Sequence, residues 1–307
     1  MKQLAWVTLF LSCATASAPT RGEIIEVALT VDDLPVHGPL IDGVTRLDLA
    51  ERMLGVFEQH HLPKVYGFVN GHHLDADAST AEVLNAWVAH GNPLAKHGYS
   101  HLNINQSTVE QYTSDIVKNE PALSHFVSTE SVWHLYRYPF LYEGETAEKR
   151  AAVQTFLSER HYTAAPVSID GDDWAFNAPY ARCEREEDRA ALRELYVKVH
   201  LEELQRMHAL TKQLMGRAVP QVLLLHIGVA DAATIEALLT AYEREGVRWV
   251  ELPAALADPF YAIDTAPARF GAALPYRVAK ARGVTAGPTI YATDLEERLA
   301  KTCAAAK

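Results

Sequence analysis

The sequence has no cluster of basic residues. Its 307 residues include 28 lysines and arginines against 39 aspartates and glutamates, and the formal net charge is -11. A protein that binds nucleic acid or an anionic membrane without sequence specificity concentrates positive charge on one surface. The composition therefore argues against a nucleic-acid partner and favours a neutral substrate over a polyanion.

Beyond its N-terminus, the sequence also lacks an apolar run that approaches the ~20 residues needed to span a bilayer. The N-terminus has the three parts of a signal peptide: Lys2, the apolar stretch LAWVTLFLSCATA and the small residues ATASA. We expect cleavage near residues 16–18, after Ala16 in preference to Ala18. Residues 1–18 are thus predicted to be a signal peptide, and the mature protein is predicted to be secreted or periplasmic.

Cysteine is scarce, with three in the whole sequence. Cys13 falls in the signal peptide. A lipoprotein anchored at Cys13 is the alternative, although Phe10 stands where an aliphatic residue is usual in such motifs. Cleavage leaves Cys183 and Cys303 in a compartment that permits disulfides, and an even pair favours a bridge. Two unrelated thiols remain the alternative, because geometry decides whether a bridge can close.

The chain has no low-complexity linker, so we expect residues 19–307 to form one domain. Apolar runs and helical periodicity alternate along it. Ser79 with Glu82, and Ser107 with Glu110, have the pattern of capping boxes at two helix starts. The expected strands are residues 23–31, 64–71, 92–95, 131–137, 162–169, 221–227 and 247–252, and the expected helices are residues 46–61, 79–91, 107–121, 195–214 and 232–246. This order predicts an α/β fold with a parallel sheet and crossover helices, and its length suits a barrel.

Ionisable residues gather where five of these strands end. Asp32 and Asp33 close the first strand, the segments KHGYSH, YRYPF and DGDDW follow three others, and His226 ends the run QVLLL. Charged residues are common in loops, so each of these segments has an ordinary structural explanation. In a parallel barrel, however, the C-terminal ends of the strands share one rim and carry the chemistry. We therefore expect the five segments to converge on one site.

Two histidines form the most specific local pattern. His97 and His101 are four residues apart, a spacing that would place both imidazoles on one face of a helical turn. With one carboxylate they predict a three-ligand metal site that leaves positions for water and substrate. One residue of the Asp32–Asp33 pair can then bind the metal while its neighbour acts as the base. Two solvent-facing histidines would have the same spacing, and a turn would explain the aspartates.

These segments resemble the motifs of the polysaccharide deacetylase family, which shares the NodB homology domain and is also called carbohydrate esterase family 4. TVDD corresponds to the family's TFDD, HGYSH to H-x-x-x-H, RYPF to R-x-P-Y, DGDDW to D-x-x-D-W and LLLH to L-x-L-H, in this order along the chain. YGFVNG is similar to the family's second strand. The resemblance extends from about residue 24 to residue 250, most of the mature chain.

The resemblance implies a distorted (β/α) barrel of seven or eight parallel strands. It also implies one divalent metal ion bound by Asp33, His97 and His101, with zinc as the first expectation and cobalt, nickel and manganese as alternatives.

The resemblance further assigns the proton transfers. Asp32 would be the general base, positioned by Arg137, and His226 the general acid, oriented by Asp173. The backbone N–H of Tyr138 would hold the oxyanion. A surface ion pair remains the alternative for Arg137, and a helix cap for Asp173.

The sequence departs from the family pattern at the rim of the expected site. Leu34 replaces the glycine after the paired aspartates, Phe140 replaces the tyrosine of R-x-P-Y, and Ile227 follows the last histidine where an acid is usual. None of these changes removes an expected metal ligand or proton carrier. They bear instead on which substrate fits.

Aromatic residues and two extra segments complete the expected rim. Trp174 and Phe176 would stack on a sugar ring or pack in the core, and we assign Phe140 and Trp174 as substrate contacts. An insert at about residues 175–200 would wall the groove, and a helical tail occupies about residues 255–307.

Together these features predict a secreted, metal-dependent hydrolase that removes N-acetyl groups from an amino-sugar saccharide such as chitin, peptidoglycan or an exopolysaccharide. An O-acetyl esterase would use the same residues on a better leaving group. A hydrolase of non-sugar amides is a further alternative. A secreted glycan-binding protein is the non-enzymatic alternative, and it would need none of the proposed proton carriers.

Overall fold

A computed structural model describes residues 23–126, 134–268, 271–287 and 294–304. The predicted signal peptide, residues 1–18, lies outside the described residues, and so do residues 131–133 of the predicted strand 131–137. No helix in the described part of the chain combines the length and apolar character of a membrane span.

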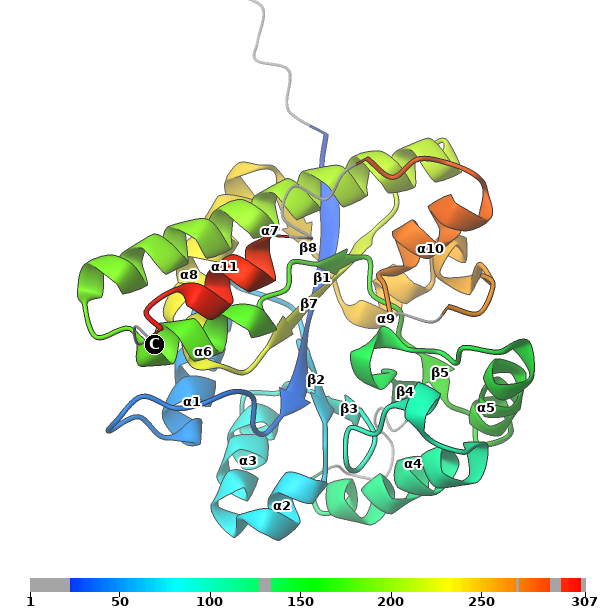
Figure 1. The fold of residues 1–307 in the computed structure, drawn as a ribbon, viewed down its shortest axis with the longest axis horizontal. Helices are drawn as coiled ribbons and strands as arrows, with labels where there is room; N and C mark the ends of the chain where they lie inside the picture. The colour runs from blue at the N-terminus through cyan, green and yellow to red at the C-terminus, as the bar shows by residue number, and fades with distance from the viewer. Residues whose placement is uncertain (1–22, 127–133, 269–270, 288–293, 305–307) are drawn as a thin grey trace, which may run out of the picture.

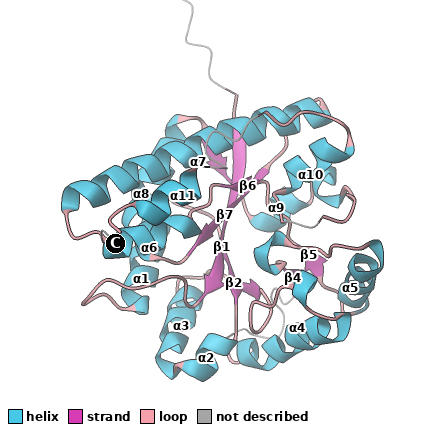
Figure 2. Cartoon of the chain, viewed as in Figure 1, coloured by secondary structure: helices cyan, strands magenta, loops and turns pink. Residues whose placement is uncertain are grey.

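The strands form one sheet in which every pair is parallel, as the alternating sequence pattern predicts (Figure 2). Seven strands follow the order β5-β4-β3-β2-β1-β7-β6, and β8 pairs with β1. Since β5 and β6 end this order and do not pair with each other in the described chain, the barrel is distorted and open on one side. The strands are β1 (Ile25–Leu34), β2 (Tyr66–Val69), β3 (Leu94–Lys96), β4 (Leu135–Tyr136), β5 (Thr163–Ala164), β6 (Ile169–Asp170), β7 (Gln221–His226) and β8 (Val247–Trp249).

The opening lies where one longer strand was expected. Residues 162–169 are not a single strand: β5 pairs with β4, whereas β6 pairs with β7 at the other end of the sheet. Pro166 stands between them, and proline has no N–H to donate to a sheet ladder. The segment therefore crosses from one edge of the sheet to the other.

Helices surround the sheet (Figure 1). Those expected at residues 46–61, 195–214 and 232–246 are confirmed, although α7 is longer than the periodicity indicated. The α-helices are α1 (Arg46–Gln59), α2 (His72–Ala76), α3 (Ala81–Ala89), α4 (Val109–Ser124), α5 (Ala147–Glu159), α6 (Trp174–Arg182), α7 (Glu186–Met215), α8 (Val229–Arg244), α9 (Leu252–Leu256), α10 (Leu274–Ala281) and α11 (Leu295–Lys301), and the 3-10 helices are η1 (Ala78–Thr80), η2 (Ile104–Gln106), η3 (Pro139–Leu141) and η4 (Pro259–Ala262).

Both predicted capping boxes are wrong in position. Ser79 lies in η1, and α3 begins after Thr80 without a side-chain cap. Helix α4 is capped by Thr108, which forms a capping box with Gln111, one residue beyond the predicted pair. Ser107 and Thr108 are both residue types that cap helices, so the local pattern did not decide which one begins the helix.

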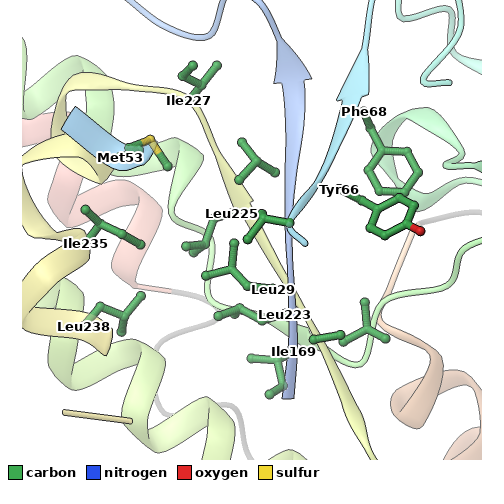
Figure 3. Close-up of a cluster of buried hydrophobic side chains, with 14 of the residues drawn as sticks. Leu29, Met53, Tyr66, Phe68, Ile169, Leu223, Leu225, Ile227, Ile235 and Leu238 are labelled. Atoms are coloured by element: carbon green, nitrogen blue, oxygen red, sulfur yellow. The ribbon is translucent and has the colours of Figure 1, made fainter. Parts of the chain in front are cut away.

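The core lies on both faces of the central strands. Strand β1 is flanked by β7 on one edge and by β2 and β8 on the other, and nearly all of its side chains are buried. Leu29, Leu223 and Leu225 meet Ile235 and Leu238 of α8 in the main cluster (Figure 3). Burial on both faces requires a nearly continuous apolar strand, which the sequence of β1 and β7 provides. This rigid centre holds the strand ends that carry the polar residues.

A disulfide joins Cys183 and Cys303, as the sequence predicted, across 120 residues. It ties the end of α6 to the segment that follows α11. Arg182 strengthens the same junction by donating hydrogen bonds to the carbonyl oxygens of Thr302 and Leu299 at 2.8 and 2.6 Å. The predicted insert at residues 175–200 thus consists of α6 and the first half of α7, and the tail is fastened to it.

Candidate active site

The C-terminal ends of β1, β3, β4, β6 and β7 surround a cavity of about 360 Å³. All five polar segments singled out in the sequence reach it, so their predicted convergence is confirmed. A larger groove of about 940 Å³ lies between α7 and α8, but its lining includes no histidine or aspartate. The smaller cavity is lined by Asp32, Asp33, His37, His97, His101, Tyr138, Phe140, Leu141, Tyr142, Asp170, Asp172, Trp174, Leu224, His226 and Gly271.

The register of the sheet aligns the strand ends. Asp32 of β1 is directly opposite His226 of β7 in the parallel ladder. Strand β3 meets β4 in the same way, and the Arg137 N–H donates to the carbonyl oxygen of Lys96 at 2.9 Å, which brings Arg137 beside His97. Residues far apart in the sequence thus share one layer at the rim.

Backbone strain is concentrated at the same place. Among the described residues, eight that are not glycine have a positive φ, and five of these line the cavity. They are Asp33, His101, Phe140, Leu141 and Asp172, with φ between 53° and 59°. Such conformations cost roughly 1–3 kcal/mol each and persist where the surrounding structure enforces them. Their clustering is typical of a functional site.

Asp33, His97 and His101 form a compact set of potential metal ligands. Asp33 Oδ1 lies 3.4 Å from Nε2 of His97 and 3.4 Å from Nε2 of His101. Two ligand atoms at about 2.1 Å from one tetrahedral ion lie roughly 3.4 Å apart, so these separations fit zinc-like coordination. In addition, Asp33 Oδ1 is shielded from solvent and accepts no hydrogen bond within the described chain. The three residues present therefore fit a divalent ion.

The protonation states of His97, His101 and Asp33 also favour metal binding. The Nδ1 of His97 lies 2.9 Å from the carbonyl oxygen of Arg137, and since a carbonyl only accepts, Nδ1 carries the proton and Nε2 keeps its lone pair. Burial lowers the pKa of His97 and of His101 to about 4. Burial would raise the pKa of Asp33, but the His37 hydrogen bond and the nearby histidines lower it. Neutral imidazoles and a carboxylate suit zinc and related metals.

The two histidines do not lie on a helical turn, contrary to the sequence prediction. They belong to a loop after β3 in which Gly98 and His101 have φ of 77° and 53°. Asp115 of α4 holds this loop by accepting hydrogen bonds from the N–H groups of Tyr99 and Ser100. A Cβ at position 98 would lie 2.9 Å from the Asp115 carboxylate, so glycine is required there. The two imidazoles are therefore brought together by a loop with positive φ angles and not by a helical turn.

Asp32 and Arg137 form a buried ion pair. Arg137 Nη1 lies 3.2 Å from each carboxylate oxygen of Asp32, and its Nε donates to the carbonyl oxygen of Ala165. Both side chains are almost fully buried. Burial raises the pKa of Asp32 to about 6, and the charge of Arg137 opposes that rise. The carboxylate is therefore poised to exchange a proton near neutral pH, and Arg137 is not a surface ion pair.

His226 and Asp173 form a second buried pair. Asp173 Oδ1 lies 2.9 Å from His226 Nδ1, and its Oδ2 accepts from the His226 backbone N–H at 2.6 Å. Although Asp173 stands at the N-cap of α6, its side chain makes no capping hydrogen bond. Burial alone would lower the pKa of His226, but Asp173 raises it well above its ordinary value. The pair thus keeps a protonated imidazole in the cavity, and the helix-cap alternative is wrong.

Tyr138 and two aromatic side chains complete the lining. The Tyr138 N–H donates no hydrogen bond within the described residues and so is free for a bound oxygen. Phe140 and Trp174 are exposed at the rim, at 50% and 41%. Phe176 is instead fully buried, with its ring 5.2 Å from that of Tyr196, so core packing is the correct interpretation for it.

Sequence reasoning missed two members of the site. His37 lies in the cavity with its Nδ1 2.9 Å from Asp33 Oδ2. Its signal was present, because it follows Asp33 by four residues within LTVDDLPVHGP. Asp170 also lines the cavity, and burial with the charges of Asp172 and Asp173 raises its pKa to about 7. The DGDDW motif directed attention to the last aspartate alone.

Residues 21–156 match the model of the polysaccharide deacetylase family. This confirms the resemblance and covers Asp32, Asp33, His97, His101 and Arg137. The match ends before Asp173 and His226, whose place in the site rests on the fold. No curated protein matches the chain in sequence.

Solved structures show the same fold at low sequence identity. A CE4 family pseudoenzyme from Bacillus anthracis is 12% identical with a TM-score of 0.53, and the alignment covers 78% of this chain and 67% of the other. A polysaccharide deacetylase from Bacillus cereus is 17% identical with a TM-score of 0.51, covering 74% and 91%. A peptidoglycan deacetylase mutant from Bacillus subtilis is 16% identical with a TM-score of 0.50, covering 78% and 91%. These likenesses establish the deacetylase fold.

Proposed function

We propose that this chain is a metal-dependent deacetylase that hydrolyses the N-acetyl groups of an amino-sugar saccharide and releases acetate. The observation that carries the proposal is the juxtaposition of a three-ligand metal set with two buried proton carriers, Asp32 and His226, in one cavity. His226 Nε2 lies 3.9 Å from Asp33 Oδ2, and His97 Nε2 lies 3.6 Å from Asp32 Oδ2. An acid and a base thus flank the ligands.

A divalent ion, zinc in the first place, would be held by Asp33, His97 and His101 and would supply a Lewis acid that polarises the acetamide carbonyl and acidifies water. The alternatives are cobalt, nickel and manganese, which accept the same nitrogen and oxygen donors.

Asp32 is the base in this proposal. Its carboxylate accepts a proton from the attacking water as the new carbon–oxygen bond forms. Arg137 holds both oxygens of Asp32 in place and favours the ionised state, while burial keeps the carboxylate basic enough to accept a proton.

His226 is the acid. The carbon–nitrogen bond breaks as His226 Nε2 gives its proton to the nitrogen, so the product leaves as an amine and the acetyl group leaves as acetate. Asp173 orients the ring and stabilises the imidazolium. An amine is a poor leaving group without this proton, whereas an alcohol needs it less. Because Asp173 holds His226 in place as a proton donor, the site favours amide substrates over O-acetyl esters.

The Tyr138 N–H would donate to the carbonyl oxygen as negative charge develops there. The exposed rings of Phe140 and Trp174 border the opening, where they would stack against a sugar face. The substrate would be part of a chitin-like, peptidoglycan-like or exopolysaccharide-like chain.

The remaining alternatives have distinct signatures. An O-acetyl esterase would release acetate without a new amine, and a hydrolase of non-sugar amides would ignore saccharides. The fold by itself does not decide catalysis, since a CE4 relative is described as a pseudoenzyme. A glycan-binding protein would have no use for the Asp32–Arg137 and His226–Asp173 pairs, and their retention here supports an enzyme.

The decisive experiment measures free amine and free acetate from a panel of N-acetylated and O-acetylated saccharides and simple acetamides. Amine and acetate in equal amounts from an N-acetylated saccharide would support the proposal. Acetate without amine would identify the esterase, and saccharide binding without product would identify the glycan-binding protein.

We further propose that the mature protein is one catalytic domain, residues 19–307, that is exported after cleavage near residues 16–18. The Cys183–Cys303 disulfide supports an oxidising compartment.

A further inference from the structure

We propose that His37 is a positioning residue that holds the Asp33 carboxylate in the orientation required for metal binding. By engaging one oxygen of Asp33, His37 leaves the other directed at His97 and His101. This inference rests on the proposed metal site and extends it to a residue that the family's sequence pattern does not include.

The two oxygens of Asp33 have different surroundings. Oδ2 lies 2.9 Å from His37 Nδ1, a hydrogen-bond distance. Oδ1 accepts no hydrogen bond within the described residues and lies 3.4 Å from Nε2 of both His97 and His101, the spacing of ligands around a shared ion. Oδ2 therefore makes the contact that orients the carboxylate, and Oδ1 is left in the position of a metal ligand. Ligating carboxylates commonly have such hydrogen-bonded partners.

The backbone of Asp33 does not by itself fix the direction of its carboxylate. Its φ of 59° is in the left-handed region, which residues other than glycine rarely adopt, and the carboxylate still rotates about its own side-chain bonds. Without the contact, the carboxylate could turn away from the two histidines. The His37–Asp33 pair is also largely shielded, with 18% and 15% of the side chains exposed, so water competes poorly for the hydrogen bond.

His37 is itself held by the start of α1. Arg46 Nη1 donates to the carbonyl oxygen of His37 at 2.8 Å, and Nη2 donates to that of Gly38 at 2.6 Å. Gly38 has a φ of 62°, and a Cβ there would meet Asn177 of α6 at 3.0 Å. The loop is thus held between α1 and α6, as a preorganised metal site requires.

A second ion between Asp33, His37 and His226 is the competing interpretation, since these side chains also cluster. The separations argue against it. His37 Nδ1 is 2.9 Å from Asp33 Oδ2, shorter than the roughly 3.4 Å expected between ligands of a tetrahedral ion. His226 Nε2 is 3.9 Å from the same oxygen, and its other nitrogen is engaged by Asp173. One hydrogen bond explains His37 without a second ion.

The test compares His37→Leu, which removes the donor, with His37→Asn, whose amide N–H can replace Nδ1–H. Zinc and cobalt affinities are measured by competition with a chromophoric chelator, together with ions bound per chain and the visible spectrum of the cobalt form. Loss of an orienting partner typically weakens metal binding ~10–100-fold. We expect that loss in His37→Leu with an altered cobalt spectrum, and recovery of affinity and spectrum in His37→Asn.

His60 provides a matched control, because its Nδ1 lies 3.0 Å from the carboxylate of Glu243 outside the cavity. His60→Leu and His60→Asn should leave metal affinity unchanged. If His37→Leu does not fold, as judged by thermal unfolding, His37→Gln takes its place, since its longer side chain moves the amide away from Asp33.

The outcomes separate this inference from the proposed function. His97→Ala is measured in parallel, and if it binds metal as tightly as the wild type, the proposed metal site itself is wrong. If His97→Ala loses metal while the donor-free His37 variant keeps wild-type affinity, only the role of His37 is overturned. It is overturned also if His37→Asn binds no better than that variant, or if the wild type binds two ions and the variant binds one.

Discussion

The Asp173 carboxylate accepts two hydrogen bonds from His226, one from its backbone N–H at 2.6 Å and one from Nδ1 at 2.9 Å. The first fixes where the residue lies and the second fixes how its ring is turned. Since Asp173 is fully buried, water cannot replace either contact. The proposed acid thus depends on a residue that does not line the cavity.

Asp173→Asn tests this dependence. An amide lacks the negative charge that stabilises the imidazolium, so we expect the rate to fall by ~10²-fold or more while metal content stays at the wild-type level. Initial rates and elemental analysis on the same samples provide the measurement. His226→Ala combined with Asp173→Asn should lose little beyond His226→Ala alone, and fully additive losses would contradict a shared role.

Asp32→Asn and Asp33→Asn separate the base from the metal ligand. Asp32→Asn leaves the three ligands intact, so metal content should persist while the rate falls by ~10²-fold or more, because an amide cannot accept the proton. Asp33→Asn should weaken metal binding, because a neutral oxygen replaces an anionic ligand. The opposite pattern of metal contents would mean that the two roles are reversed. Full metal and full rate in both variants would make the pair structural.

Removal of the metal should abolish turnover. Asp33, His97 and His101 converge without another partner for Asp33 Oδ1, so a chelator should leave a folded but inactive protein. We expect zinc, or another divalent transition metal, to restore the rate. Circular dichroism before and after chelation checks that folding is unchanged. Full activity in protein shown by elemental analysis to be metal-free would refute the assigned site.

Loss of the disulfide should destabilise the fold. Cys303→Ser frees the C-terminal segment from α6, and a bridge that closes a long loop typically contributes ~2–4 kcal/mol to the free energy of unfolding. Denaturant unfolding of the oxidised wild type and of the variant measures the difference. Mass spectrometry of a digest made without reductant should find the peptides of Cys183 and Cys303 linked, and two alkylatable thiols would refute the bridge in solution.

We expect the contribution of Asp231 to the free energy of unfolding to decrease as the pH rises. The residue is fully buried on α8, where it accepts hydrogen bonds from Asn177 and Tyr196 at 2.9 and 2.8 Å, and burial together with Asp173 raises its pKa well above the usual value. The native state keeps this proton after the unfolded chain, with a pKa of about 3.9, has lost it. The contribution of Asp231 is therefore complete below about pH 4 and declines by up to ~1.4 kcal/mol per pH unit until the native pKa is reached.

The check for Asp231 is the free energy of urea unfolding between about pH 5 and pH 8. Asp231→Asn cannot titrate, so the wild type should lose stability relative to this variant as the pH rises. The exposed Asp42 provides the control, and Asp42→Asn should follow the wild type. A difference between wild type and Asp231→Asn that does not change with pH would contradict the prediction.

Much of the site could be located without coordinates because strand ends are visible in sequence. A buried strand is an apolar run, and the polar residues that end it lie at the C-terminal edge of the sheet. Asp32, Asp33 and His226 follow such runs directly, and the structure places them in one layer. The five family motifs supplied the remaining residues by resemblance.

The sequence did not reveal local backbone conformation. HGYSH has helical spacing but forms a loop, because contacts with Asp115 stabilise positive φ at Gly98 and His101. Residues 162–169 have the composition of one strand, yet Pro166 and two different neighbours divide them. Dihedral angles at such places are set by partners that lie elsewhere in the chain.

By itself, therefore, the sequence determined the α/β class and the residue types at the strand ends, and it favoured a bridge between Cys183 and Cys303, because apolar periodicity, the positions of polar residues and the cysteine count are read directly from it. Only the tertiary structure decided that the barrel stays open between β5 and β6, that Asp173 serves His226 in place of capping α6, and that His37 engages Asp33. Each of these depends on long-range packing or on a left-handed backbone conformation. Long-range packing and left-handed conformations produce no periodic pattern of residue types in a sequence.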